Sequence, residues 1–283
     1  MNLKIALQRS GRLAEESTAL LKKCGVTFSN GMGKLRAEAA NFPLEIFFLR
    51  DDDIPDYVAD GVADVGIVGE NVLAEHPKAV DVVEKLGFGR CRLSIAVPKG
   101  REYSISTLEG ARIATSYPRV LSGFLAERQV TAEIHEISGS VEIAPSIGLA
   151  DAVCDLVSSG STLFSNGLAE VETVMRSQAV LIAGRNVGSE ASELLEQLRF
   201  RIRSVKAASE NKYILLNAPK ARVEDIIRIL PGMRSPSVLP LADSDWVSVH
   251  SVVEQADLWA VLDELRALGA EGILVLSIDQ MIR

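Results

Sequence analysis

The sequence predicts an α/β protein with two similar lobes, followed by a smaller βαββαβ module. Up to about residue 185, short apolar runs of strand length alternate with amphipathic segments of helical period. Such alternation predicts parallel sheets joined by right-handed crossover connections. The pattern restarts near Gly87, so we expect two lobes with a ligand-binding cleft between them. Beyond about residue 212 the order becomes strand, helix, strand, strand, helix, strand, which predicts a ferredoxin-like module.

The composition limits the classes of function. Of the 283 residues, 47% are hydrophobic and 24% are charged, which is typical of a globular protein. A net charge of −8 argues against general binding to nucleic acid or membranes. No run of 18 uncharged apolar residues occurs, and the first residues suit a strand rather than a signal peptide. Cys24, Cys91 and Cys154 lie far apart among apolar residues, which favours free thiols in the cytoplasm over disulfides.

The sequence gives no reason to propose a metal held by the protein alone. The three histidines, His76, His135 and His250, lie far apart, and no Cys/His spacing typical of zinc is present. Mg²⁺ carried on substrate phosphates fits better, because this ion needs only one or two protein carboxylates. An acidic chain that binds phosphates also needs local positive groups such as arginines or helix N-termini.

The most informative stretch is a strand at residues 152–157, a Ser/Gly/Thr turn at 158–162, and a helix start. Hydroxyls and free N–H groups before a helix favour a phosphate, and Gly160 lets the backbone approach it closely. Asp151 and Asp155 would both lie near the strand end, where their oxygens can bind ribose hydroxyls. Together they suggest a phosphoribosyl group, although most Ser/Gly turns after strands bind nothing. No Gly-Lys-Ser/Thr follows, so the turn is not a Walker A loop.

Polar side chains also follow the predicted strands of the first lobe, which span residues 4–7, 44–49 and 64–69. These side chains lie in the turn of residues 8–12, at Arg50, and at Glu70 and Asn71. Ligands of open α/β sheets bind at such strand ends. The competing interpretation is a solvated turn in which Ser10 only caps the following helix.

The second lobe and the C-terminal module complete the predicted elements. A further turn at residues 138–142 is expected to open a helix, and residues 171–175 and 179–183 are expected to form a strand pair. A long helix is predicted at residues 189–207. The module after it contains no constellation of catalytic side chains, which favours a role in binding, regulation or assembly.

Five stretches resemble the ATP phosphoribosyltransferase family in its long form, which catalyses the first step of histidine biosynthesis. They span residues 7–13, 50–55, 66–71, 114–118 and 139–163, and the last is the most specific. The resemblance covers essentially the whole chain. It departs from the family in the turn Gln8-Arg9-Ser10-Gly11-Arg12, where many members have Pro-Lys-Gly-Arg.

The resemblance implies two periplasmic-binding-protein-like catalytic lobes and a ferredoxin-like regulatory domain. The first lobe would span residues 1–88, completed by about 177–205; the second would span 89–176 and the regulatory domain 206–283. The implied assembly is a homohexamer built from dimers. The implied reaction moves the phosphoribosyl group from phosphoribosyl pyrophosphate to N1 of ATP, with Mg²⁺ as cofactor. L-histidine would be a feedback inhibitor, and AMP is a further ligand that the resemblance allows.

The resemblance also implies site residues, position by position. Catalytic roles would fall to Arg12, Arg50 and Glu142. ATP would contact Gln8, Ser10, Gly11, Arg12, Glu70, Asn71 and Tyr117. Phosphoribosyl pyrophosphate would contact Asp151, Asp155, Ser158, Ser159, Gly160, Ser161, Thr162 and Leu163. L-histidine would contact Asn217, Ser237, Leu239 and Gly272. Some relatives have an aspartate where this chain has Asn217, which would bind an α-amino group better.

A small-molecule binding or sensor protein is the alternative, because two α/β lobes with a ferredoxin-like module suit that role too. The arginines and the Ser/Gly/Thr turn favour the phosphoribosyl enzyme.

Overall fold

The computed structural model describes residues 2–29, 35–100, 102–230, 232–243 and 245–282. The chain forms two compact units. One consists of Met1–Lys22 with Val26–Leu195, and the other of Lys23–Gly25 with Glu196–Arg283. The first unit contains two sheets and therefore two lobes, and the second unit contains one sheet.

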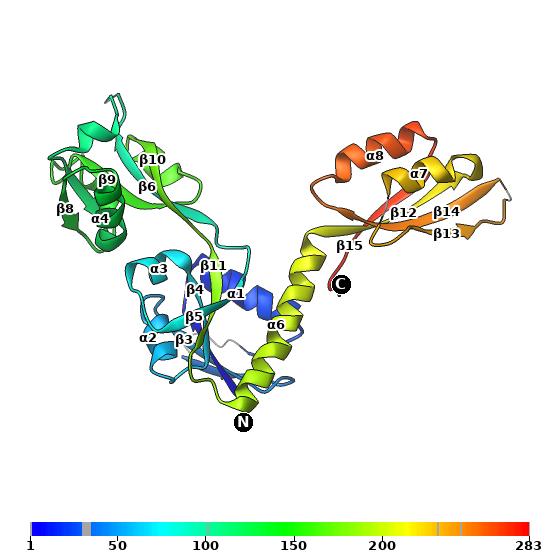
Figure 1. The fold of residues 1–283 in the computed structure, drawn as a ribbon, viewed down its shortest axis with the longest axis horizontal. Helices are drawn as coiled ribbons and strands as arrows, with labels where there is room; N and C mark the ends of the chain where they lie inside the picture. Colours follow the sequence, from blue (N-terminus) through cyan, green and yellow to red (C-terminus); the bar gives the residue numbers. More distant parts are fainter. Residues whose placement is uncertain (1, 30–34, 101, 231, 244, 283) are drawn as a thin grey trace. The chain divides into compact units, whose positions relative to one another are not determined.

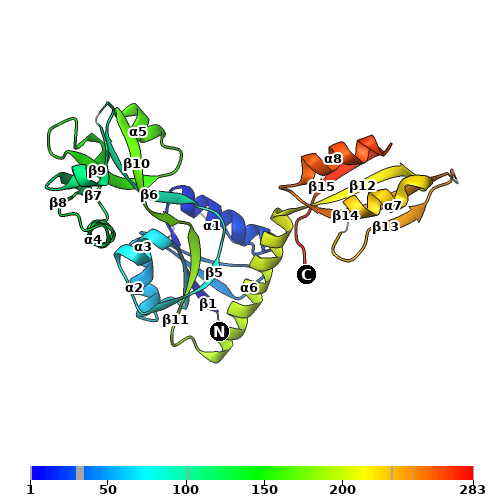
Figure 2. The same cartoon turned by 45° about the horizontal axis from the view of Figure 1, so that its top comes forward.

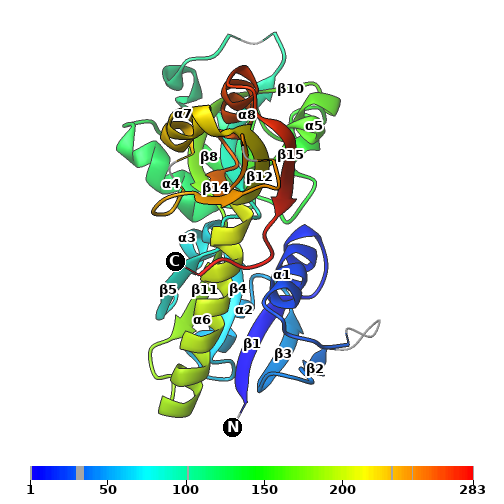
Figure 3. The same ribbon diagram turned by 90° about the vertical axis from the view of Figure 1, so that its right-hand side faces the viewer.

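The sheet of the first lobe has six strands in the order β2-β3-β1-β4-β11-β5. In chain order they are β1 (Leu3–Gln8), β2 (Arg36–Glu38), β3 (Leu44–Leu49), β4 (Val65–Gly69), β5 (Val80–Lys85) and β11 (Ala179–Gly184). The central strand β1 runs parallel to both β3 and β4, as the sequence predicts, and Figure 3 shows β2, β3 and β1 side by side. The helices are α1 (Arg12–Lys23), α2 (Ile54–Ala59) and α3 (Glu70–Glu75).

Strands β2 and β5 are absent from the sequence-based prediction. They form the two edges of the sheet, where side chains face solvent and apolar alternation fades. Strand β2 has only three residues, too few for a periodic signal.

The sheet of the second lobe has the order β10-β6-β9-β7-β8. Its strands are β6 (Cys91–Pro98), β7 (Arg112–Thr115), β8 (Glu133–Glu136), β9 (Ala152–Val157) and β10 (Leu168–Ser177). One face carries the core that includes Ile95 and Leu121 of helix α4 (Pro118–Glu127). The opposite face carries the core that includes Ala96 and Leu163 of helix α5 (Ser161–Ser165), and Figure 2 shows α5 beside β10. A 3-10 turn, η1, spans Ile105–Leu108.

The expected pairing of residues 171–175 with 179–183 is wrong. Strand β10 pairs with β6 in the second lobe, whereas β11 pairs with β4 and β5 in the first. Only Gln178 separates the two strands, which leaves no room for a hairpin turn. The chain instead passes straight from one lobe to the other, as the green ribbon in Figure 1 shows.

Buried polar groups join the two lobes. The carboxylate of Glu75, in α3, is 6% exposed and accepts the backbone N–H groups of Arg119 and Val120 at 2.9 and 3.0 Å. These N–H groups belong to the first turn of α4, where a negative charge interacts favourably with the positive end of the helix dipole. The interaction fixes the start of a second-lobe helix against a first-lobe helix.

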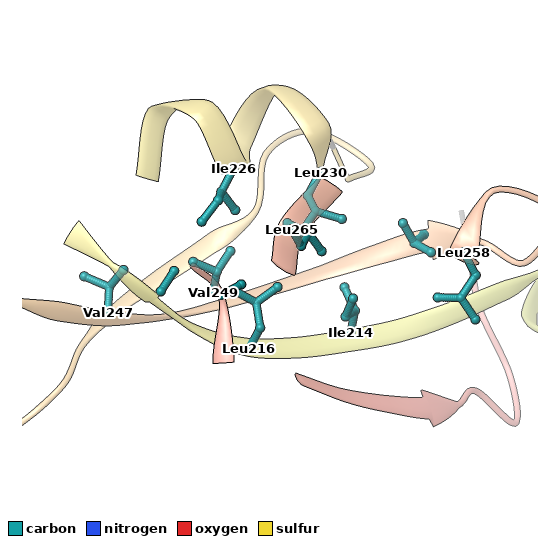
Figure 4. Close-up of a cluster of buried hydrophobic side chains, with 11 residues drawn as sticks. Ile214, Leu216, Ile226, Leu230, Val247, Val249, Leu258 and Leu265 are labelled. Atoms are coloured by element: carbon teal, nitrogen blue, oxygen red, sulfur yellow. The ribbon is translucent and has the colours of Figure 1, made fainter. Parts of the chain in front are cut away.

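The second unit confirms the ferredoxin-like prediction. After the long helix α6 (Ser189–Ser209), its strands are β12 (Asn211–Pro219), β13 (Ser237–Pro240), β14 (Trp246–Glu254) and β15 (Glu271–Ser277). They form an antiparallel sheet in the order β13-β14-β12-β15. A short 3-10 turn η3 (Lys220–Arg222) leads into α7 (Val223–Ile229), and α8 spans Leu258–Ala267. Figure 4 shows Ile226, Leu230 and Leu265 directed toward Leu216 and Val249 of the sheet.

No helix in the described part of the chain is long and apolar enough to cross a membrane.

The packing of α2 on β4 depends on Gly66. A Cβ atom at Gly66 would lie 2.6 Å from Cγ2 of Ile54, which is completely buried. We therefore expect Gly66→Ala to lower the free energy of unfolding by about 1–3 kcal/mol, the usual range for overpacking. Urea denaturation measures the change. The matched control is Gly123→Ala at an exposed position of α4, where a Cβ meets nothing within 4 Å and stability should rise by about 0.5–1 kcal/mol. Equal effects of the two substitutions would contradict this packing argument.

Candidate active site

The carboxyl ends of β1, β3 and β4 bring together the polar residues of the first lobe. Gln8 lies opposite Leu49, so the turn after β1 and the exposed Arg50 after β3 are neighbours. Strand β4 pairs with the other side of β1 and leads directly into Glu70 at the start of α3. Parallel strands thus place side chains that lie far apart in the sequence at one sheet edge.

A pocket of about 460 Å³ opens beside the β1–α1 turn. Its lining comprises Gln8, Arg9, Ser10, Gly11, Ala14, Glu15, Thr18, Ala19, Lys22 and Phe48. Gly11 has a φ of +91°, a conformation that strongly favours glycine, so it lets the turn enter the helix sharply. The sequence pattern predicts the turn, but Thr18 and Lys22 are not among the expected site residues. Their spacing of four residues on one helix, four and eight residues after Ala14, was the available signal.

Arg12 connects the first lobe to the second. Its Nη1 donates to Oγ of Ser158 at 3.0 Å, and its Nε lies 3.5 Å from a carboxylate oxygen of Glu16. The Arg12 side chain is 68% exposed, so it is accessible to a ligand. An arginine on one lobe therefore reaches the Ser/Gly/Thr turn on the other.

The turn itself has the form that the sequence predicts, a strand β9 followed by residues 158–160 and helix α5. Gly160 has a φ of +80°, and the hydroxyls of Ser159 and Ser161 lie 3.0 Å apart. Ser158, Ser159, Ser161 and Thr162 are exposed. The backbone N–H groups of Ser159 and Gly160 donate to no described residue. Leu163 is buried in the core, so only its backbone can contact a ligand.

Asp155 lies beside this turn in a half-buried position. One of its carboxylate oxygens accepts the N–H of Leu156 at 2.7 Å. Burial raises the pKa of Asp155 above its usual value, and the negative charge of Glu142 raises the pKa further. Two acidic side chains that repel each other at a turn of this kind suit a ligand rich in hydroxyls or a cation.

The helix expected after residues 138–142 is only one 3-10 turn, η2 (Val141–Ile143), which carries Glu142. Pro145 has no backbone N–H and so cannot continue the ladder of helical hydrogen bonds. Ser140 adopts a left-handed conformation with φ +51°, which is uncommon outside glycine. Such strain is frequent at ligand sites.

Asp151 lies away from the turn, contrary to the expectation that both aspartates sit near one strand end. It precedes β9, whereas Ser158 follows β9, so the strand separates them by on the order of 20 Å. The Asp151 carboxylate pairs with Arg112, with Nε at 3.2 Å, and accepts the backbone N–H of Arg112 at 3.0 Å. Asp151 therefore links β7 to the start of β9, and we do not place it at the ribose.

Asn71 and Tyr117 lie where the lobes meet. The Asn71 amide donates to the Tyr117 hydroxyl at 3.0 Å and accepts from the Ser177 hydroxyl at 2.8 Å. Burial raises the pKa of the Tyr117 hydroxyl, which keeps it protonated. Glu70, on the same helix as Asn71, pairs with Lys85 at 3.0 Å. Gly69 leaves room for the Asn71 side chain, because a Cβ there would lie 2.2 Å from its oxygen.

The second unit gathers the four residues of the expected histidine site on and beside the sheet face opposite its helices. In the strand register, Ser248 lies opposite both Asn217 and Leu239, and His250 lies opposite Ser237. A Cβ at Gly272 would lie 3.5 Å from the Asn217 amide nitrogen. Ser248 and His250 are not among the residues expected at this site. The His250 ring nitrogens lie 2.8 Å from the Tyr213 hydroxyl and 3.1 Å from the Ser248 hydroxyl.

Family models match both parts of the chain. Residues 50–204 match the model described as ATP phosphoribosyltransferase, and residues 208–280 match the model described as HisG, C-terminal domain. The chain belongs to the ATP phosphoribosyltransferase family. The second match explains the ferredoxin-like unit, because it is the C-terminal domain of the same family.

Relatives named ATP phosphoribosyltransferase match over almost the whole length. The protein of Cytophaga hutchinsonii is 57% identical over 282 residues, covering 99% of each chain. That of Bacteroides fragilis is 53% identical over 281 residues, also covering 99% of each. Among solved structures, the ATP phosphoribosyl transferase (HisG:HisZ) complex from Thermotoga maritima matches with 30% identity and a TM-score of 0.60. This match covers 71% of the present chain and 98% of the Thermotoga chain.

The described residues include no group of three or more His, Cys, Asp or Glu side chains placed to hold a metal ion.

The coupling between Asp155 and Glu142 predicts a pKa change. Glu142→Gln removes a negative charge that disfavours ionised Asp155, so the pKa of Asp155 should fall toward the usual aspartate value. Carbon-13 NMR titration of the Asp155 carboxyl measures it directly. Glu127→Gln, at the exposed end of α4, is the control and should leave the pKa of Asp155 unchanged. An unchanged or higher pKa in Glu142→Gln would show that the two carboxylates do not interact.

Proposed function

We infer that this chain transfers the 5-phosphoribosyl group from phosphoribosyl pyrophosphate to N1 of ATP. The products are phosphoribosyl-ATP and pyrophosphate, in the first step of L-histidine biosynthesis. The observation that carries this conclusion is the full-length match to relatives named for that activity, at 57% and 53% identity. The proposal makes the chain a pentosyl-transferring glycosyltransferase.

The phosphoribosyl donor is proposed to bind at the second-lobe turn. Its 5′-phosphate would contact the free N–H groups of Ser159 and Gly160 and the exposed hydroxyl of Thr162. Asp155 would accept hydrogen bonds from the ribose hydroxyls, which favours its ionised form once the sugar is bound.

ATP and pyrophosphate are proposed to bind at the edge of the first-lobe sheet. The proposed contacts are Gln8, Ser10, Gly11, Arg12, Arg50, Glu70, Asn71 and Tyr117. The pocket of about 460 Å³ beside the β1–α1 turn and the two exposed arginines support this assignment. Asn71 and Tyr117 bond to each other, so their contribution would include holding the lobes at the distance that the two substrates need.

The reaction needs charge stabilisation more than a strong base. The ribose carbon becomes oxocarbenium-like as pyrophosphate leaves, and N1 of adenine attacks with a lone pair that carries no proton. Arg12 and Arg50 would stabilise the departing pyrophosphate through charge-assisted hydrogen bonds. Holding both substrates in one cleft adds a large proximity effect. Glu142 would orient the adenine amino group or balance the developing positive charge.

Mg²⁺ is the proposed cofactor and would be held mainly by substrate phosphates. Asp155 and Glu142 suit it, because this ion takes one or two protein carboxylates and keeps oxygen ligands from substrate and water. When bound, it neutralises phosphate charge.

Regulation and assembly complete the proposal. L-histidine would bind beside Asn217, Ser237, Leu239 and Gly272 and favour one state of the protein over another by about 1–3 kcal/mol. We propose a cytoplasmic homohexamer of dimers, with AMP as a further ligand of the ATP site. The proposed domains are residues 1–88 with about 177–205, then 89–176, and 206–283.

The direct test is product formation from ATP, phosphoribosyl pyrophosphate and Mg²⁺, with pyrophosphatase present to draw the reaction forward. We expect phosphoribosyl-ATP to form, and L-histidine to suppress it. Product that histidine leaves unaffected would contradict the proposed regulation and leave the enzyme activity standing. Folded protein that gives no product would contradict the enzyme assignment.

Arg12 offers a sharper test of the site. Arg12→Ala should lower kcat/KM by about 10²–10³, the typical loss for one preorganised transition-state donor. The matched control is Arg185→Ala, which removes another exposed arginine, one that lies 3.9 Å from Asp81. Steady-state kinetics with both substrates measures the change, and thermal unfolding checks that both variants are folded. A loss confined to Arg185→Ala, or equal losses, would contradict the role of Arg12.

A further inference from the structure

We propose that the ion pair of Arg92 with Glu170 positions the phosphate-binding turn. The pair would fix the peptide between Ser158 and Ser159 and thereby set the affinity for the 5′-phosphate of the donor. This inference rests on the proposed function of residues 158–162.

The guanidinium of Arg92 divides its donors between the ion pair and the turn. Its Nε and Nη2 each donate to one carboxylate oxygen of Glu170, the planar two-point geometry that is strongest for arginine. The Ser94 hydroxyl donates to the same carboxylate at 2.8 Å. The remaining nitrogen, Nη1, donates to the backbone carbonyl of Ser158 at 3.3 Å. Glu170 therefore holds the guanidinium in the orientation that reaches the turn.

The bond to the Ser158 carbonyl sets the direction of the next N–H group. A trans peptide is planar, and its C=O and N–H point in opposite directions. None of the described peptide bonds is cis. Because Arg92 holds the Ser158 carbonyl on its own side, the Ser159 N–H points away from Arg92, and it donates to no described residue. An N–H held in this way is preorganised for an anion.

A β-bulge places Glu170 on the correct face of the sheet. In a regular strand, Glu170 and Glu172 would share a face, because side chains alternate. In β10 the register shifts between them, so Glu170 lies opposite Ala96 and Glu172 lies opposite Ile95. Ala96 belongs to the core on the α5 side, and Ile95 to the core on the α4 side. The bulge thus directs Glu170 toward the turn and Glu172 toward Arg128, 3.8 Å away on the other face.

The charges of the pair support a positioning role. Hydrogen bonding to Arg92 holds the pKa of Glu170 below its usual range, so the carboxylate stays ionised and remains paired with Arg92. The side chains of Arg92 and Glu170 are 30% and 26% exposed, which is less than the 68% of Arg12. The ionised pair is neutral overall, so its part is to orient the turn rather than to add positive charge there.

The test compares Arg92→Met with Arg128→Met. The second variant breaks the contact of Arg128 with Glu172, which lies on the same strand as Glu170 but on the opposite face of the sheet. Arg92→Met should raise the KM for phosphoribosyl pyrophosphate about tenfold, as expected for a lost hydrogen bond to a charged donor, while the KM for ATP stays unchanged. Inhibition by ribose 5-phosphate, which carries the 5′-phosphate alone, should weaken by the same factor. Inhibition by pyrophosphate should not change. Arg128→Met should alter none of these constants.

A third variant, Arg92→Lys, separates positioning from simple attraction and also serves if Arg92→Met fails to fold. Lysine keeps the charge but cannot bind Glu170 and Ser158 in one fixed plane, so ribose 5-phosphate should bind it more weakly than the wild type. Wild-type affinity in Arg92→Lys, or equal weakening of pyrophosphate and ribose 5-phosphate, would overturn the inference. Thr162→Val tests the turn itself: if it leaves donor binding unchanged, the proposed function of the turn fails, independently of Arg92.

Discussion

The arrangement of the site depends on how Ser158 is held between two arginines. Arg12 of the first lobe donates to its hydroxyl at 3.0 Å, and Arg92 of the second lobe donates to its carbonyl at 3.3 Å. The two contacts have different consequences. The first brings an exposed positive charge across to the turn, and the second fixes the backbone from which N–H groups project. A phosphoribosyl pyrophosphate molecule bound there would meet the oriented N–H donors with its 5′-phosphate and the charge of Arg12 with its pyrophosphate.

The connections between the lobes keep these two contributions in reach of each other. Glu75 binds the first turn of α4, and Asn71 links Ser177 to Tyr117 in a buried network. The parallel order β3-β1-β4 places the polar site residues of the first lobe at one edge of its sheet. On the other lobe, β9 carries Asp155 and leads into the turn. Family membership, the two-lobed fold and this geometry agree on the transfer of a phosphoribosyl group.

Local patterns predicted much of this fold, and long-range contacts account for what they missed. Strand β9 and its turn were readable because a buried strand and a Ser/Gly/Thr turn are local signals. The partner of Asp151 was not, since Arg112 lies 39 residues away and no spacing rule links them. Arg92 and Glu170 are 78 residues apart in the sequence. The face of the sheet that Glu170 occupies depends on a β-bulge, which sequence periodicity does not predict. The site residues carried over from the family stay predictions, apart from Asp151, which the structure places elsewhere.

The most direct measurement is a crystal structure of the chain with phosphoribosyl pyrophosphate and Mg²⁺ bound. The account predicts that the 5′-phosphate lies within hydrogen-bonding distance of the Ser159 N–H and the Thr162 hydroxyl, with Arg92 still on the Ser158 carbonyl. It also predicts that Asp155 contacts the ribose and Arg12 the pyrophosphate. A 5′-phosphate bound instead in the pocket beside Lys22, with residues 158–162 free of ligand, would contradict the account.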